Sequence, residues 1–360
     1  MLNQPQQAFP DPSEDSSNTR QNELGTEPTP ESETAVDDEV DDMSQSPVTS
    51  AMDKEFFGTA EDICLTPEIE RATKIVANHI RQDWPGCVIY GHKRTGRSSF
   101  CKYLHRSISA LTGGSTLSFH WISLKADERS DVDYLKTRIR QAGFDGYNHN
   151  SRAILITRLK DYIEDKAAEC GARRILFILD EAQLTSEAQM GFIGDVANEL
   201  SNSYRVFVLL VGQYELHKLA EEYKSEEARN IASRYFQLKE PFHGIRLEDL
   251  AATWNSLDSC SGESAVARHF PTLAASGWTL GNAAAVAINA LNSMREEMGI
   301  VHEMRLSMEC VRTMANSILY RMDSIRANPL SSITEKSFRQ WLRKTDYSAI
   351  MHRYQVEMRK

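Results

Sequence analysis

Residues 88–100, VIYGHKRTGRSSF, contain a short segment bounded by two glycines. A short apolar run precedes this segment, and a pattern typical of a helix follows it. The apolar run ends at Gly91, and Gly96 stands just before the helical pattern. Glycine lets several backbone N–H groups close around an anion, and a helix N-terminus adds positive potential. The order therefore constrains this region to a strand, a phosphate-holding loop and a helix.

The stretch GHKRTGRS (91–98) matches the phosphate-loop template G-x-x-x-x-G-K-[ST] at both glycines and at the final hydroxyl. Arg97 occupies the lysine position, and a longer planar guanidinium need not fit the same cradle. A working site, a damaged site and a chance match are all open at this point. The predicted nucleotide-binding residues are Gly91, His92, Lys93, Arg94, Thr95, Gly96, Arg97, Ser98 and Ser99.

A second motif follows about eighty residues later, where the apolar run RILFILDEAQ (174–183) ends in two carboxylates. We expect Asp180 to hold Mg²⁺, together with the hydroxyl of Ser98, and Glu181 to polarise the attacking water. The alternative is a strand that ends in a charged turn. Two such motifs in this order disfavour chance, and they predict ATP and Mg²⁺ as cofactors.

Two further polar positions are candidates for the same chemistry. Gln213 follows the apolar run RVFVLLVG (205–212) and is expected near the γ-phosphate or its water, although a plain loop amide fits equally well. Arg229 and Arg234 precede the last predicted strand, where ring-forming ATPases carry an arginine finger for the neighbouring subunit. We select Arg234; the alternative is a helix-face arginine in a salt bridge.

The apolar runs lack the polar alternation of half-exposed strands, and helical patterns separate them. Strands buried on both faces indicate a parallel sheet sandwiched by helices, so the predicted fold class is α/β, doubly wound. Strand signals fade after Pro241. The predicted parts are a disordered acidic tail over 1–52, a nucleotide-binding α/β domain over 53–243, a helical lid over 244–298 and a basic helical C-terminal extension over 299–360.

Charge is placed unevenly along the chain. Residues 1–50 hold twelve Asp or Glu and one basic residue, Arg20, a net charge of −11, so with −10 overall the remainder carries about +1. Such a segment buries too little apolar surface to order itself, and it serves either as a solubilising tail or as an acidic arm. An apolar run of the ~18 residues that a membrane helix needs is missing, and so is a secretory leader pattern, which favours a cytoplasmic protein without membrane contact.

Several stretches resemble the AAA+ ATPases, and within them the TniB/TnsC-type transposition regulators. They are YGHKRTGRSSF, RLKDYIEDKAAECGARRILFILDEAQLTSE, VLLVGQYEL and SRYFQLKEPFHGIRLEDLAATWNSLD, and the resemblance extends over 56–294. It implies an AAA+ P-loop fold and an ATP-dependent protein that assembles as a ring or filament on double-stranded DNA. It also implies partners, a transposase and a target-selection protein.

The chain departs from this family at two places. One is Arg97, and the other is SGWTLGNAAAV (276–286), which has no basic residue where a sensor-2 arginine often stands. Both departures weaken the case for hydrolysis more than the case for binding. Two alternatives therefore stay open: a nucleotide-gated scaffold with little hydrolysis, and a loader or initiator-type AAA+ ATPase of replication or secretion.

Candidate DNA contacts are less specific. Basic residues gather on the helix predicted over 131–142 and in the loop before it, and a basic, aromatic segment spans 336–360. A solvated helix and a terminal helix packed on the body explain these patterns equally well. The basic candidates of the first group are Lys125, Arg129, Lys136, Arg138 and Arg140.

Overall fold

The computed structural model describes residues 56–57, 63–123, 130–260, 262–301, 303–325 and 327–344. The predicted acidic tail, the loop residues Lys125 and Arg129, and the end of the basic segment beyond 344 lie outside the described residues. Among the described residues, every helix is too short or too polar to cross a lipid bilayer.

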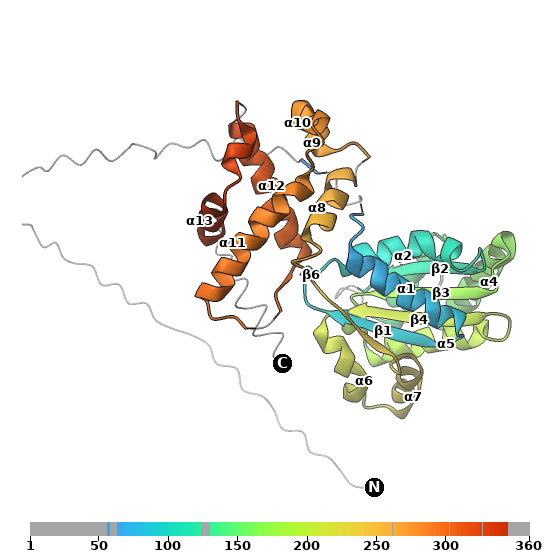
Figure 1. Ribbon diagram of the computed structural model, residues 1–360. Coiled ribbons are helices and arrows are strands. Elements are labelled where there is room, and N and C mark those ends of the chain that lie inside the picture. Colours follow the sequence, from blue (N-terminus) through green and yellow to red (C-terminus); the bar gives the residue numbers. More distant parts are fainter. Residues whose placement is uncertain are drawn as a thin grey trace, which may run out of the picture. The chain divides into compact units, whose positions relative to one another are not determined.

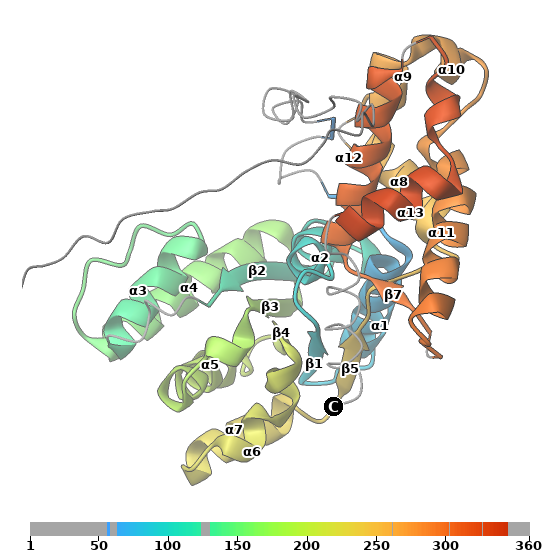
Figure 2. The ribbon, with the colours of Figure 1, turned by 90° about the vertical axis from the view of Figure 1, so that its left-hand side faces the viewer.

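Five parallel strands form the central sheet, in the order β2-β3-β4-β1-β5 (Figures 1 and 2). Their bounds are β1 Gly86–Gly91, β2 Thr116–Ile122, β3 Arg174–Asp180, β4 Arg205–Gly212 and β5 Lys239–Phe242. Since all five run the same way, the residues that follow β1, β3 and β4 emerge at one edge of the sheet. The predicted phosphate loop, Asp180 and Gln213 therefore share that carboxyl edge, and the predicted parallel α/β sheet is confirmed.

Helices cover both faces of the sheet (Figures 1 and 2). They are α1 Pro67–Arg81, α2 Arg97–Leu111, α3 Asp131–Gln141, α4 Arg152–Cys170, α5 Glu187–Leu200, α6 Leu219–Glu222 and α7 Glu226–Tyr235. Successive strand residues serve opposite faces: Phe177 packs among side chains of α3, α4 and α5, whereas Ile178 packs among those of α1 and α2. Both are fully buried, which explains why polar residues do not alternate along the strand.

After β5 the chain is mainly helical. The elements are β6 Ile245–Arg246, α8 Leu250–Ser259, α9 Ala265–His269, α10 Pro271–Ala275, α11 Ala284–Glu297, β7 Arg305–Leu306, α12 Met308–Ser324 and α13 Glu335–Lys344. Short 3-10 helices lie before β5, at 182–184 and 214–218, and after it, at 280–283 and 329–332. The two-residue strands β6 and β7 pair antiparallel, with Ile245 opposite Leu306.

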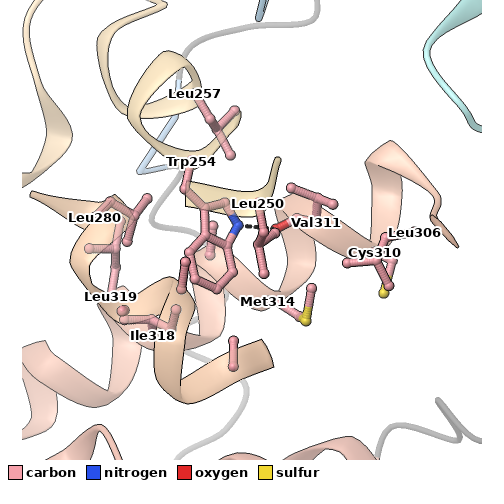
Figure 3. Packing of buried hydrophobic residues seen from close by; sticks show 14 of the residues in the cluster. Leu250, Trp254, Leu257, Leu280, Leu306, Cys310, Val311, Met314, Ile318 and Leu319 are labelled. Carbon is pink, nitrogen blue, oxygen red and sulfur yellow. Dashed lines mark hydrogen bonds between the residues drawn. The ribbon is translucent and has the colours of Figure 1, made fainter. Parts of the chain in front are cut away.

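One apolar core joins these helices. Trp254 is fully buried at its centre, and its indole Nε1 donates a hydrogen bond to the main-chain oxygen of Val311 at 3.0 Å (Figure 3). The same core takes in Phe56 from the start of the described chain and Leu342 from α13. Residues on both sides of the boundary predicted at 298 thus bury their side chains together.

Candidate nucleotide-binding site

The phosphate-loop candidate connects β1 to α2 and is shaped by its two glycines. A Cβ on Gly91 would lie 2.2 Å from the main-chain oxygen of Phe242 on β5, so only glycine fits there. Gly96 precedes α2 with φ +104°, in the left-handed region, and no side chain caps the helix behind it. The first N–H groups of α2 therefore remain available to an anion at the loop.

Arg97 begins α2, and its side chain is only 6% exposed. Its guanidinium donates hydrogen bonds to the main-chain oxygen of Gly91, at 2.7 Å, and to that of Gly212. Burial lowers the pKa of Arg97, and the nearby carboxylates of Glu181 and Asp180 oppose that shift. The arginine at the lysine position thus links the C-terminal end of β1 to the C-terminal end of β4 by hydrogen bonds.

The side chain of Ser98 lies beside the carboxyl group of Asp180, close enough to lower the pKa of that carboxyl, so the two predicted Mg²⁺ ligands are neighbours. Asp180 is 3% exposed, and its Oδ1 accepts the N–H of Glu181 at 2.9 Å. Burial raises the pKa of Asp180, while the side chain of Ser98 counteracts that rise. A hydroxyl and a carboxylate side by side offer the oxygen ligands that Mg²⁺ prefers, so these residues fit the ion.

Glu181 follows Asp180 in the chain with φ +55°, a conformation rare for a non-glycine residue. Its Oε2 accepts hydrogen bonds from Gln183 Nε2 at 2.5 Å and from Gln213 Nε2 at 3.3 Å. Gln183 also accepts the backbone N–H of Gln213 at 3.0 Å, and Arg97 Nη2 lies 3.9 Å from Glu181 Oε1. Two amides and a guanidinium therefore orient one carboxylate.

The sequence predicts Gln213 near the γ-phosphate or its water but predicts no role for Gln183. Its position two residues after Glu181, in a turn that closes a buried strand, was the available signal. A side chain on such a tight turn can fold back onto its neighbour, and here it does.

The loop has one contact with the helical part that the sequence does not indicate. Arg94 Nη1 lies 2.6 and 2.5 Å from the two carboxylate oxygens of Glu309 on α12. The N–H of Met308 also donates to the main-chain oxygen of Arg94 at 2.9 Å. Both Arg94 and Glu309 are well exposed, so solvent screens the pair.

Within the loop, Thr95 Oγ1 donates to the main-chain oxygen of His92 at 2.9 Å, which closes the loop on itself. Lys93 is exposed. Ser99 is the third residue of α2 and is half-buried. The predicted nucleotide-binding residues thus lie together at the carboxyl edge of the sheet, with Lys93 and Arg94 exposed and Thr95 and Arg97 buried.

Arg234 lies elsewhere. It is exposed near the end of α7, where it donates to Asn198 Oδ1 at 2.8 Å. The next residue, Tyr235, packs against Gly86 at the beginning of β1, at the opposite edge of the sheet from the loop. A part for Arg234 in catalysis therefore requires the nucleotide site of another subunit.

The basic residues of α3 make contacts within the chain. Arg138 is fully buried and donates to the main-chain oxygen of Ile122 at 2.5 Å, so this candidate DNA contact is not accessible to DNA. Lys136 donates to Asn150 Oδ1 at 2.8 Å, and the Arg140 guanidinium lies 4.7 Å from the ring centroid of Tyr147.

Comparison with known protein families agrees with this architecture. Residues 83–220 match the family model described as an AAA domain. No curated protein sequence matches the chain. Three solved structures are similar: the ORC2 protein of Aeropyrum pernix in its ADP form, Cdc6p of Pyrobaculum aerophilum, and the ORC1 protein of Aeropyrum pernix in complex with DNA.

The sequence identities to these three structures are 16%, 11% and 14%, and the TM-scores are 0.42, 0.48 and 0.40. The matches cover 69%, 76% and 76% of this chain and 67%, 65% and 72% of theirs. The chain thus spans about two thirds of the length of the first two. With its five-stranded parallel sheet, its phosphate loop and the family match, the chain contains an AAA domain of the P-loop ATPase fold.

Proposed function

We propose that the chain binds ATP with Mg²⁺ at residues 91–99 and hydrolyses it slowly. The observation that carries the proposal is that Ser98 lies beside Asp180, while two amides orient the adjacent Glu181. Bound Mg²⁺ would be held by Ser98 and Asp180 and would neutralise charge on the phosphates. The N–H groups of the loop and of the start of α2 bind the phosphate oxygens.

The carboxylate of Glu181 orients and polarises the attacking water, and Gln183 and Gln213 hold that carboxylate in place. Arg97 supplies positive charge at the base of the loop, but two main-chain oxygens engage its guanidinium. Because these oxygens already hold the guanidinium, we expect ATP binding to depend little on Arg97. Stabilisation of the charge that develops in the transition state depends on Arg97 more. The hydrogen bonds of Arg97 to the main chain therefore favour slow turnover, and for the same reason a nucleotide-gated scaffold is the second candidate.

Nucleotide binding and turnover separate these two candidates. Equilibrium titration with a fluorescent ATP analogue and Mg²⁺ should give saturable binding, which Asp180→Ala weakens and the surface variant Glu169→Gln leaves intact. Phosphate release should then be measurable in the wild type and lost in Glu181→Gln. Absence of binding overturns the proposal, and binding without turnover in either protein establishes the scaffold.

For the biological role we propose regulation of DNA transposition by an oligomer assembled on double-stranded DNA. The support is the likeness of 56–294 to TniB/TnsC-type regulators, in the loop, in DEAQ and in VGQYEL. The expected partners are a transposase and a target-selection protein.

Electron microscopy with duplex DNA and a non-hydrolysable ATP analogue tests the assembly. Rings or filaments that require both components are expected, and single subunits under these conditions would contradict the proposal. An integrase-type transposase gene beside this one is the expected genomic setting. A neighbouring replication gene would instead favour the loader or initiator alternative.

A further inference from the structure

A second group of metal-ligating side chains shares Asp180 with the Mg²⁺ candidates. Cys101 of α2, His120 of β2 and Asp180 at the end of β3 bring one ligand atom each within 4.8 Å of one another. His120 Nε2 is 4.0 Å from Asp180 Oδ2. Three separate elements of the domain thus converge on one point with sulfur, nitrogen and oxygen.

The surroundings make these atoms unusual. Cys101 is fully buried, Asp180 is 3% exposed, and the side chain of His120 is 12% exposed. His120 Nε2 is itself buried, and within the described chain it lacks a hydrogen-bond partner. Nearly all buried polar atoms in proteins have a partner, so an orphan nitrogen that faces a thiol and a carboxylate requires an explanation.

A transition-metal dication supplies that explanation. Thiolate, imidazole and carboxylate are the ligands of zinc, at about 2.3, 2.0 and 2.1 Å. Around a tetrahedral ion such ligand atoms lie roughly 3.3–3.7 Å apart, so the present spacing needs to close by only about 1 Å. Thiolate and carboxylate together balance the two positive charges, which removes the cost of a buried net charge. Mg²⁺, by contrast, prefers oxygen ligands throughout.

We propose that Cys101 Sγ, His120 Nε2 and Asp180 Oδ2 bind one transition-metal ion of the Zn²⁺ class. On binding, the Cys101 thiol releases its proton to solvent and its sulfur bonds to the metal, while the fourth position of the ion stays open to water. This ion draws Asp180 away from Ser98. Resting on the ATP and Mg²⁺ function proposed above, the consequence is that Zn²⁺ and Mg²⁺–ATP compete for the protein.

Cobalt tests the site without nucleotide. Co²⁺ titrated into a Cys170→Ser background, which removes an exposed and unrelated thiol, should give a thiolate charge-transfer band that saturates at one ion per chain. Stoichiometric Zn²⁺ should abolish the band. Cys101→Ser and His120→Asn should each weaken binding at least tenfold, and Cys260→Ser is the matched control that leaves it unchanged. Circular dichroism of both variants ensures that an unfolded protein is not mistaken for a lost site.

Two outcomes would overturn the proposal: a charge-transfer band that persists in Cys101→Ser, and cobalt binding without a thiolate band. For the competition, Zn²⁺ should weaken Mg²⁺–ATP binding in the wild type but not in Cys101→Ser. Equal weakening in both proteins contradicts that part alone. Because the cobalt measurement contains no nucleotide, failure of ATP to bind would overturn the proposed function and leave the metal site standing.

Discussion

The guanidinium of Arg97 donates a hydrogen bond to the main-chain oxygen of Gly212, which joins the first residue of α2 to the tip of β4. A second bond from the same group reaches Gly91 at 2.7 Å. A lysine ammonium carries three donors on one nitrogen, whereas the guanidinium spreads five donors over a fixed plane. Here Nη1 alone meets both main-chain oxygens, and Nη2 lies 3.9 Å from Glu181 Oε1. The substitution at this loop position therefore has a structural consequence, because it links three elements at the carboxyl edge.

Substitutions of Arg97 should distinguish its contribution to fold stability from the contribution of its charge to ATP turnover. Arg97→Ala leaves two main-chain oxygens without their donor, and we expect a loss of about 2–3 kcal/mol in the free energy of unfolding. Arg97→Lys keeps the charge on a shorter side chain without the planar group, so we expect a loss of about 1 kcal/mol with ATP binding retained and turnover equal or higher. Urea denaturation and phosphate release measure both, with the exposed Arg106→Lys as control. A sharp loss of nucleotide binding in Arg97→Lys would show that the site needs arginine geometry.

Glu181 should be required for turnover and dispensable for binding. Glu181→Gln keeps the shape of the side chain but cannot polarise water, so we expect phosphate release to fall by about 10²-fold or more. Gln183→Ala removes the 2.5 Å hydrogen bond to the carboxylate and should cost roughly tenfold through poorer orientation. Single-turnover hydrolysis checks both, with nucleotide affinity measured alongside. Unchanged rates in both variants would exclude Glu181 as the group that activates water.

Asp180→Asn should stabilise the metal-free fold at neutral pH. Burial raises the pKa of Asp180, so the fold favours its protonated form. A carboxyl group whose pKa is higher in the folded than in the unfolded state stabilises the fold fully at pH values below its unfolded-state pKa. This stabilisation is lost as the pH rises through the folded-state pKa. At pH 7 we expect Asn to raise the free energy of unfolding by about 1 kcal/mol, and the gain should shrink in acid.

Urea denaturation in a chelator at neutral and acidic pH checks this expectation. The side-chain oxygen of Asn can still accept the N–H of Glu181, so local geometry is preserved. Mg²⁺–ATP should stabilise the wild type but not the variant. A gain of the same size at both pH values would exclude carboxylate burial as its cause.

Local patterns in the sequence were enough to predict the sheet, the phosphate loop and the meeting of Ser98 with Asp180. Parallel strands bring their carboxyl ends to one edge, so residues that follow separate strands become neighbours without further information. The burial of Arg138 was not predictable, because helical spacing alone does not reveal that its guanidinium reaches the Ile122 oxygen at the end of β2. Similarly, a two-residue ladder such as β6–β7 is too short to leave a periodic pattern.

Arg94 and Glu309 are 215 positions apart in the chain, so no local sequence pattern predicts their ion pair. We expect Glu309→Gln to free the Arg94 guanidinium for phosphate and to tighten ATP binding by about two- to fivefold, an effect that added salt should reduce. Titration of a fluorescent ATP analogue at low and high ionic strength measures this. Glu303→Gln is the matched control, since that carboxylate pairs with Arg246 and Arg305 instead. Weaker ATP binding in Glu309→Gln would mean that the contact positions the loop instead of competing for it.

Arg234 and the phosphate loop lie at opposite edges of the sheet, which makes a test by subunit mixing possible. Arg234→Ala keeps its own Glu181 but offers its neighbour no guanidinium, whereas Glu181→Gln offers the guanidinium but cannot hydrolyse ATP itself. Each variant alone should be inactive in phosphate release. In the proposed oligomer on DNA, an Arg234→Ala site beside a Glu181→Gln subunit would regain both groups, so partial turnover should return. Arg229→Ala in place of Arg234→Ala is the matched control and should be active alone. Mixtures as inactive as their components would place the finger elsewhere or exclude the oligomer.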